Sequence, residues 1–526
     1  MAQDSLFLGD HLGETAFDSS GNVESFSPSA EREGFRLDAG SAIQRSPDAA
    51  RTQLTLRKPL NDPATILIEF YFKETAQLFS CYDSSMNPFR TTVSRLWNSS
   101  PLLCRTLQSM AAANLVENFP QLSVLGRRFR REAIEMLKED DYCGDAASKG
   151  TQPATTNTTS DTLLAMLMLG GSASWHDPKD LGLTFFNSIR RKLVSIDTKS
   201  SAIDYQFFHQ CMTYWELLLS YVADDEQLDK LDGDRHVRVQ EPVFPDLVPH
   251  PWTGFARDTQ NAVQRVGRLI RQQRKLAFSR RFTSISHIKQ LEKDMATASE
   301  LEEFLSNMCH PLESSVLDPK DHNTPVWQLL TLAEAYRSVG LIQIYHIFPD
   351  ILDRRLTREG IYQPVQSDED HDNTPTPTFS QQTRNEYLTT YAVQVLSLMK
   401  TIPLESGTRD FQPFILASLC SELRLPSLAS QAGPDDNYMA GITLQVIETS
   451  RMRQFLRGRL ESFLHILPPK PIRRCLDIVN RTWELMDDRA AEAAMVGSSR
   501  RGSCPEWQEV YWMDVMIENG WETTMA

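Results

Sequence analysis

Two short acidic runs contain the residue types that could do chemistry. Residues 225–229 read DEQLD, and residues 61–69 read NDPATILIE. Clustered carboxylates of this kind can bind Mg²⁺, and the bound ion can hold the oxygens of a diphosphate. One hypothesis is therefore a magnesium-dependent enzyme that acts on a diphosphate substrate.

The two runs resemble the magnesium motifs of class I terpene synthases, which are also all-α proteins. The acid-first motif normally precedes the other, and here their order is reversed. Pro63 indicates a helix start, where Asp62 is better explained as an N-cap. DEQLD also lies inside a longer acidic stretch, DDEQLDKLDGD at 224–234, which is typical of a solvated loop. The enzyme is kept as a remote alternative, and no catalytic residue is predicted.

A basic amphipathic stretch, VQRVGRLIRQQRKLAFSRRF, covers residues 263–282. Its basic residues are Arg265, Arg268, Arg271, Arg274, Lys275, Arg280 and Arg281. The favoured interpretation is a solvated helix face paired with the acidic excess of the chain, and the second is a nuclear-import signal. Direct nucleic-acid contact ranks lower, because no aromatic residues for base stacking lie between the basic ones.

Other motifs that would reveal an enzyme or a metal site are missing from the sequence. There is no G-x-S-x-G, G-x-G-x-x-G, P-loop or H-E-x-x-H motif. The eight cysteines contain no C-x2-C pair, and their wide scatter favours reduced, buried thiols. His209, His346 and His465 are isolated from other potential ligands, which indicates structural histidines. We predict no metal, no cofactor and no enzymatic activity for this chain.

The composition narrows the class of protein further. The net charge is −15, which does not suit electrostatic binding to DNA or to anionic lipid. The first residues lack a basic region followed by an apolar core, so we expect no signal peptide. No run of about 18 apolar residues occurs, so we expect no membrane span.

Helical spacing dominates the chain from residue 61 onward, and strand alternation bounded by hairpin turns is absent. We expect an all-α helical array over 61–526, with a disordered acidic tail over 1–60. Polar insertions are predicted near 141–160, 224–250, 366–378 and 488–502. A last helix is predicted over 504–518, closed by Asn519-Gly520. Its tryptophans and methionines must dock on the body of the array.

Five stretches, in order, carry a family resemblance. They are YFKETAQLFSCYDSSMNPFRTTVSRLWNSSPLLCRTLQSMAAANL (71–115), CMTYWELLLSYV (211–222), TPVWQLLTLAEAYRSVGLIQIYHIFPDIL (324–352), SLMKTIPLESGTRDFQPFILASLCSELR (397–424) and VYWMDVMIENGWETTMA (510–526). The sequence resembles the fungal-specific transcription factor domain, the helical region that follows the zinc binuclear cluster in many fungal regulators. The D-S-x-x-N-P-F-R turn at 83–90 is part of this resemblance.

The resemblance implies a nuclear transcriptional regulator that controls a metabolic or secondary-metabolite gene set. Family members usually carry six cysteines that hold two zinc ions beside a basic helix, whereas the first cysteine here is Cys81. Zinc would belong to that missing cluster and not to this chain. We therefore expect action through protein partners, such as a dimer partner or co-regulator, with DNA reached only indirectly, no membrane contact and a small-molecule effector as an option. The alternative is a helical scaffold without a transcriptional role.

Overall fold

The computed structural model describes residues 62–146, 160–195, 204–229, 247–279, 284–360, 379–425, 436–497 and 509–525. Contacts divide the chain into two units, and every described residue belongs to the second, Pro59–Ala526. The predicted disordered tail lies outside the described residues, as does the predicted insertion at 366–378.

The first part of the unit is a run of helices whose starts are visible in the sequence. Pro63, Pro88 and Pro101 each open a helix, where the missing N–H of proline is not needed. The elements are α1 (Pro63–Phe70), the π-turn η1 (Tyr71–Thr75), α2 (Ala76–Leu78), α3 (Pro88–Leu96), α4 (Pro101–Asn114), α5 (Leu122–Ala146), α6 (Ser160–Gly171), α7 (Ala173–His176), α8 (Leu183–Ser195) and α9 (Tyr205–Val222).

The second part continues with longer helices and short 3-10 turns. These are η2 (Asp225–Gln227), α10 (Arg257–Ser279), α11 (Ile285–Asn307), η3 (Glu313–Ser315), α12 (Val326–Ile347), α13 (Pro349–Glu359), α14 (Gln381–Thr401), η4 (Gly407–Phe411), α15 (Pro413–Leu419), η5 (Cys420–Glu422), α16 (Asp436–Phe463), α17 (Pro469–Gly497) and α18 (Trp512–Asn519). In the described part of the chain, the only extended pairing is an isolated bridge between His250 and Gly254. The predicted all-α fold class is confirmed.

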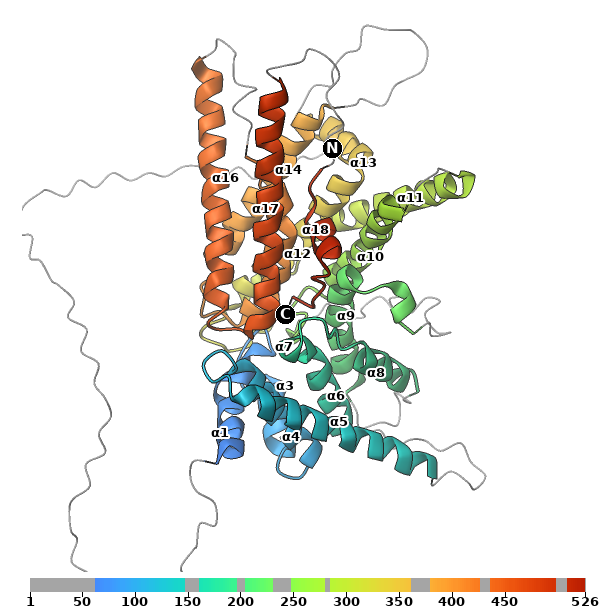
Figure 1. Ribbon diagram of the computed structural model, residues 1–526, viewed down its shortest axis with the longest axis vertical. Coiled ribbons are helices and arrows are strands. Elements are labelled where there is room, and N and C mark those ends of the chain that lie inside the picture. The colour runs from blue at the N-terminus through green and yellow to red at the C-terminus, as the bar shows by residue number, and fades with distance from the viewer. Residues whose placement is uncertain are drawn as a thin grey trace, which may run out of the picture. The chain divides into compact units, whose positions relative to one another are not determined.

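Two helices occupy the centre of the packing. Helix α4 contacts α1, α5 and α6, while α12 contacts α10, α11, α13, α14 and α15. Both are apolar on most sides, and such a helix needs neighbours all round. Figure 1 shows α12 behind the long antiparallel pair of α16 and α17, which also contact each other directly.

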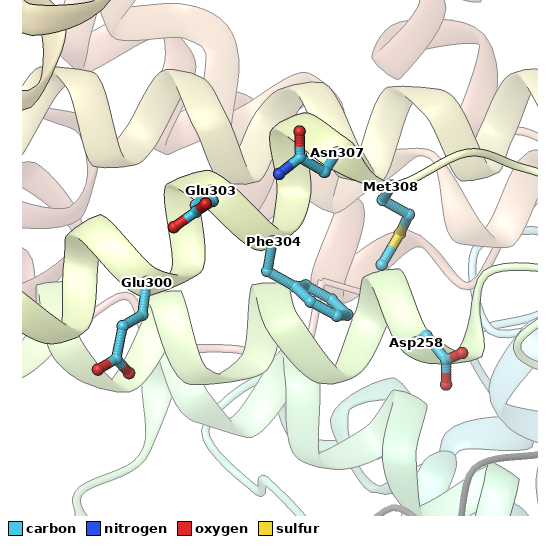
Figure 2. A pocket seen from close by; sticks show the side chains of 6 residues that line it. All are labelled: Asp258, Glu300, Glu303, Phe304, Asn307 and Met308. Atoms are coloured by element: carbon cyan, nitrogen blue, oxygen red, sulfur yellow. The ribbon is translucent and has the colours of Figure 1, made fainter.

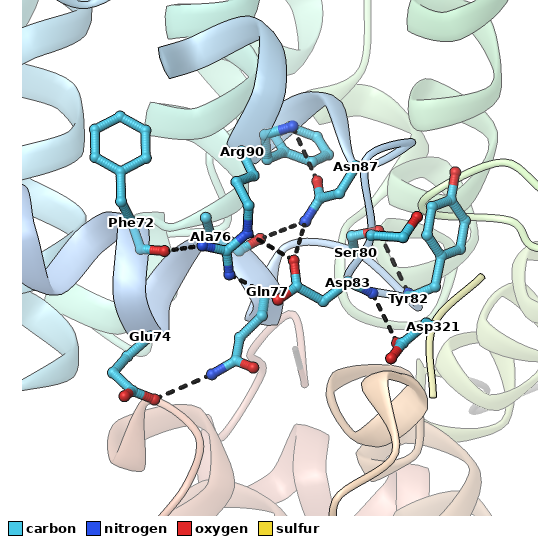
Figure 3. Close-up of polar contacts among 12 residues, drawn as sticks. Phe72, Glu74, Ala76, Gln77, Ser80, Tyr82, Asp83, Asn87, Arg90 and Asp321 are labelled. Carbon is cyan, nitrogen blue, oxygen red and sulfur yellow. Dashed lines mark hydrogen bonds and ion pairs between the residues drawn. The ribbon is translucent and has the colours of Figure 1, made fainter. Parts of the chain in front are cut away.

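The D-S-x-x-N-P-F-R turn joins α2 to α3 (Figure 3). The Asn87 side chain accepts a hydrogen bond from the Phe89 backbone N–H at 3.0 Å and donates to the Ala76 carbonyl at 3.1 Å. Arg90 pairs with both carboxylate oxygens of Asp83, at 2.8 and 2.6 Å. The polar residues of this turn therefore have a structural role, since Asn87 caps α3 and Asp83 and Arg90 tie the helix to the chain before it.

Several predicted boundaries were wrong, each for a packing or propensity reason. Helix α12 runs through Gly340 without a break, and the missing Cβ of this glycine leaves room for the Leu305 and Val263 side chains. Helix α17 extends to Gly497, into the insertion predicted from 488, since this stretch is rich in the helix formers Ala, Glu and Arg. Helix α5 likewise runs to Ala146, into the insertion predicted from 141.

The last helix begins later than predicted, at Trp512 rather than Cys504. Tyr511 has an extended backbone, which lets its ring stack on His346 with the ring centres 4.5 Å apart. The predicted cap is confirmed, because Gly520 adopts the left-handed conformation with φ 62° directly after the helix. Trp512, Met513 and Met516 belong to the core, so the C-terminal segment docks on the array as predicted.

Candidate functional site

The basic residues predicted on 263–282 lie on α10, and most of them are engaged inside the unit. Arg268 pairs with Glu216 of α9 at 2.9 Å and also with Asp225. Arg271 pairs with Asp224 at 3.0 Å and donates to the Tyr221 carbonyl at 2.9 Å. The face of α10 therefore holds the acidic turn that follows α9.

The remaining basic residues divide into three groups. Lys275 shares Asp224 with Arg271, and Arg274 pairs with Asp514 of α18. Arg265 is exposed, with no ion-pair partner among the described residues. Arg280 and Arg281 lie outside the described residues. The contacts agree with the acid-pairing part of the favoured interpretation, but the face is not solvated throughout, because the Arg271 side chain is buried.

Two of the three carboxylates of the DEQLD run are engaged by arginines. Asp225 pairs with Arg268, and Asp229 pairs with Arg191 of α8 at 3.2 Å. In the other run, Asp62 occupies the N-cap position of α1 and accepts a hydrogen bond from the Thr65 hydroxyl, without a cap bond to the backbone. Among the described residues, no group of His, Cys, Asp and Glu side chains is arranged to hold a metal ion.

A buried ionic cluster anchors the start of the C-terminal segment. His346 contacts Glu422 at 2.8 Å, and Arg424 bridges Glu422 at 2.8 Å to Glu509 at 2.5 Å. Burial raises the pKa of Glu422, but the charges of His346 and Arg424 outweigh this effect and hold it at about 2. His346 is thus a structural partner of a carboxylate. His209 is half-buried and His465 is exposed.

A surface groove of about 660 Å³ lies between the start of α10 and the end of α11 (Figure 2). Phe304 and Met308 lie at its centre, and Phe304 is 50% exposed. Its other lining residues are Asp258, Glu300, Glu303 and Asn307. Asp258 pairs with its neighbour Arg257 at 3.2 Å, whereas Glu300 and Glu303 have no ion-pair partner among the described residues. The groove therefore combines an apolar floor with an acidic rim.

A small enclosed cavity lies where the early, middle and last parts of the unit meet. It is lined by Phe79, Gly171, Trp175, Tyr214, Trp215, Leu218, Trp252, Asp410, Phe411 and Thr524. Asp410 is 6% exposed, and burial raises its pKa to about 7 despite the opposing charge of Arg409. Sequence reasoning did not single out Asp410.

The groove and the cavity could not be read from the sequence, because their residues come from separate segments. One signal was available: although Arg409 precedes Asp410, the residues after it include Phe411, Pro413 and Phe414, so one flank is mainly apolar. A carboxylate in such surroundings is a candidate for burial.

Comparison with protein families decides what kind of protein this is. A family model described as the fungal specific transcription factor domain matches residues 66–526. The chain belongs to this family. No curated protein and no solved structure matches it. The resemblance drawn from the five stretches is confirmed, and the fungal-specific transcription factor domain extends from α1 through the C-terminal segment.

Family membership makes this protein a transcription regulator in general and groups it with regulators rather than enzymes. Within the described residues, no helix combines the length and the apolar character needed to cross a membrane.

Proposed function

We propose that this fungal-specific transcription factor domain protein acts in the nucleus through protein contacts and controls a metabolic or secondary-metabolite gene set. The match to the family over 66–526 is the observation that carries the proposal. DNA is reached through a partner that reads it, and the chain itself needs no cofactor. The contacts of α10 support indirect DNA contact, because Arg268, Arg271 and Arg274 already pair with carboxylates of the same unit.

The groove between α10 and α11 is the partner surface in this proposal. Its occupant is a basic amphipathic helix of a partner protein, with an apolar side chain seated on Phe304 and Met308. The argument is charge complementarity, because Glu300 and Glu303 present carboxylates that no described residue pairs, and no basic residue is among those that line the groove. Lysines or arginines of the partner would meet these two carboxylates at the rim.

A photo-activated cross-linker placed at position 304 of the full-length chain tests this surface in its own host. We expect cross-linked peptides, identified by mass spectrometry, that alternate basic and apolar residues at helical spacing. The double variant Glu300→Lys with Glu303→Lys should abolish them. Glu292→Lys is the matched control, because Glu292 is exposed on the same helix but does not line the groove. Cross-links only to a second copy of this chain, or to acidic peptides, would contradict the proposal.

Genome-wide chromatin occupancy of the tagged chain tests the regulatory role. Discrete peaks at promoters of metabolic genes are expected, and the DNA motif under the peaks would identify the module that brings the chain there. Absence of peaks in cells where the chain is well expressed would favour the helical scaffold instead.

Nuclear import is tested by imaging the same tagged chain. The triple variant Arg265→Ala, Arg280→Ala and Arg281→Ala removes Arg265, which has no ion-pair partner among the described residues, and the two arginines of the stretch that lie outside them. Cytoplasmic retention of the variant would support an import signal in this stretch. Unchanged nuclear enrichment would place the signal elsewhere.

A further inference from the structure

The enclosed cavity is walled mainly by aromatic rings. Phe79 contacts Trp175 and Trp252 edge-on, with ring centres 5.6 and 5.4 Å apart. Tyr214 lies 4.9 Å from Phe411 between ring centres. These rings come from α7, α9, η4 and the connections after α2 and before α10, so the cavity lies at a junction of several elements.

Three polar atoms of its lining are buried without a hydrogen-bond partner among the described residues. They are Asp410 Oδ1, Trp215 Nε1 and Thr524 Oγ1, on side chains that are 6%, 2% and 5% exposed. Such atoms are rare in folded proteins, because each loses its bonds to water without replacement. All three residues line one cavity. Asp410 Oδ1 and Thr524 Oγ1 can accept hydrogen bonds from one bound cation, whereas Trp215 Nε1 is a donor and needs an acceptor such as a water molecule.

The charge of Asp410 is also left without a direct partner. The neighbouring Arg409 directs its Nη1 to the Glu405 carbonyl at 3.4 Å, and no ion pair joins it to Asp410 among the described residues. A buried carboxylate requires either a proton or a compensating cation. A neutral water could bridge the polar atoms but would leave this charge uncompensated.

The lining residues and the volume of the cavity indicate which kind of cation it can bind. Hard metal ions need several oxygen ligands, whereas the side chains here offer one carboxylate and the hydroxyls of Tyr214 and Thr524 among aromatic rings. Aromatic faces attract organic cations such as ammonium groups. The cavity volume is about 30 Å³, which suits an ion of one or two heavy atoms. We infer that the cavity is a binding site for ammonium or methylammonium, held by Asp410 and the surrounding aromatic rings.

This inference goes beyond the proposed regulatory role and can be tested without it. Thr524 lies in the C-terminal segment, while Asp410 lies in η4 and Tyr214 in α9. A bound cation would therefore stabilise the docking of the C-terminal segment on the array.

Calorimetry and thermal unfolding of the full-length chain at about pH 8 test the site, with methylammonium chloride as the ligand. A ligand that binds only the folded state raises the melting temperature in a saturable way. We expect this rise with methylammonium and not with sodium, potassium or tetramethylammonium chloride at the same ionic strength. The same rise with all four salts, or none with methylammonium, would overturn the inference.

Two variants locate the binding. Asp410→Asn should weaken methylammonium binding about tenfold or more, and Thr524→Val about fivefold. Glu292→Gln, at an exposed carboxylate outside both the cavity and the groove, should leave methylammonium binding unchanged. An unchanged response in both cavity variants would contradict the site.

If Asp410→Asn does not fold, the pH dependence of methylammonium affinity in the unmodified chain tests the assignment to Asp410. The ionisable groups that face Asp410 are Arg409, which stays charged, and Tyr214 and Tyr336, whose pKa values burial raises. Only Asp410 titrates near neutrality, so protons should compete with methylammonium and its affinity should fall below about pH 7. An affinity that does not change between about pH 5 and about pH 8 would overturn the assignment to Asp410.

Discussion

Arg274 on α10 and Asp514 on α18 form a two-bond ion pair across 240 positions of sequence, with Nε donating to Oδ1 at 2.8 Å. The same guanidinium lies over the Tyr511 ring, 5.5 Å from its centre. Arg271 adds a longer contact to Glu522 at 3.6 Å. The basic face of α10 therefore holds the C-terminal segment in place, in addition to the acidic turn after α9.

Removing this pair should loosen the C-terminal segment. Arg274→Ala leaves Asp514, whose side chain is 11% exposed, without its partner, and we expect a loss of about 2 kcal/mol in the free energy of unfolding. Urea unfolding measures the loss, and hydrogen exchange of 512–519 should accelerate. Arg265→Ala is the matched control on the same helix and should change stability by less than about 0.5 kcal/mol. Equal effects of the two variants would contradict the anchoring role.

The sequence predicted that the basic face would pair with acidic residues, but not with which ones. Helical spacing is a local property, so the arginines could be placed on one face of a helix from residues 263–282 alone. Their partners lie in α9, in η2 and in α18. These segments come together only in the tertiary packing, so no local sequence pattern could predict which carboxylates pair with which arginines.

The turn between α2 and α3 should be sensitive to its asparagine. Asn87→Ala removes the cap bond to Phe89 and the bond to the Ala76 carbonyl, both fully buried, and should cost about 2–3 kcal/mol. Ser94→Ala, an exposed change in the same helix, is the control and should be close to neutral. Denaturant midpoints of the two variants give the comparison, and a neutral Asn87→Ala would show that the turn does not depend on this cap.

The contact between α9 and α10 should require Gly267. A Cβ at this position would meet Ser220 Oγ and the Tyr221 ring, the latter at 2.5 Å, so Gly267→Ala should destabilise the unit by about 2 kcal/mol through overpacking. Gly458 in α16 is the matched control, because nothing lies within 4 Å of its ideal Cβ. There the same change should stabilise by about 0.5–1 kcal/mol through helix propensity. The melting temperature should therefore fall for Gly267→Ala and rise for Gly458→Ala.

Local patterns explain why the fold class was predicted well and the candidate sites were not. Proline at the start of α1, α3 and α4 and glycine after α18 are signals within a few residues of the boundary they mark. The aromatic cavity instead joins Phe79, Tyr214, Asp410 and Thr524. Each of these reads as an ordinary core or turn residue in its own segment, so the cavity exists only once the helices have packed.

The buried carboxylate of Asp410 should give the unit a characteristic pH dependence. Its folded pKa is about 7, compared with 3.8 for the ordinary group, because burial disfavours the charged form. Between these values the folded state binds more protons than the unfolded state, so its stability falls as pH rises from about 4 to about 7. A shift of this size corresponds to about 4 kcal/mol.

The variant Asp410→Asn removes this titration and tests its sign. The stability of the variant relative to the unmodified chain should increase by about 4 kcal/mol between about pH 4 and about pH 8, in buffers without ammonium or other amines. Urea unfolding at a series of pH values measures the difference, and taking the difference cancels all other titrating groups. The stability difference between Asp410→Asn and the unmodified chain could instead be independent of pH. Asp410 would then ionise as easily in the folded unit as in water. Its burial would in that case require a cation that the protein retains through purification.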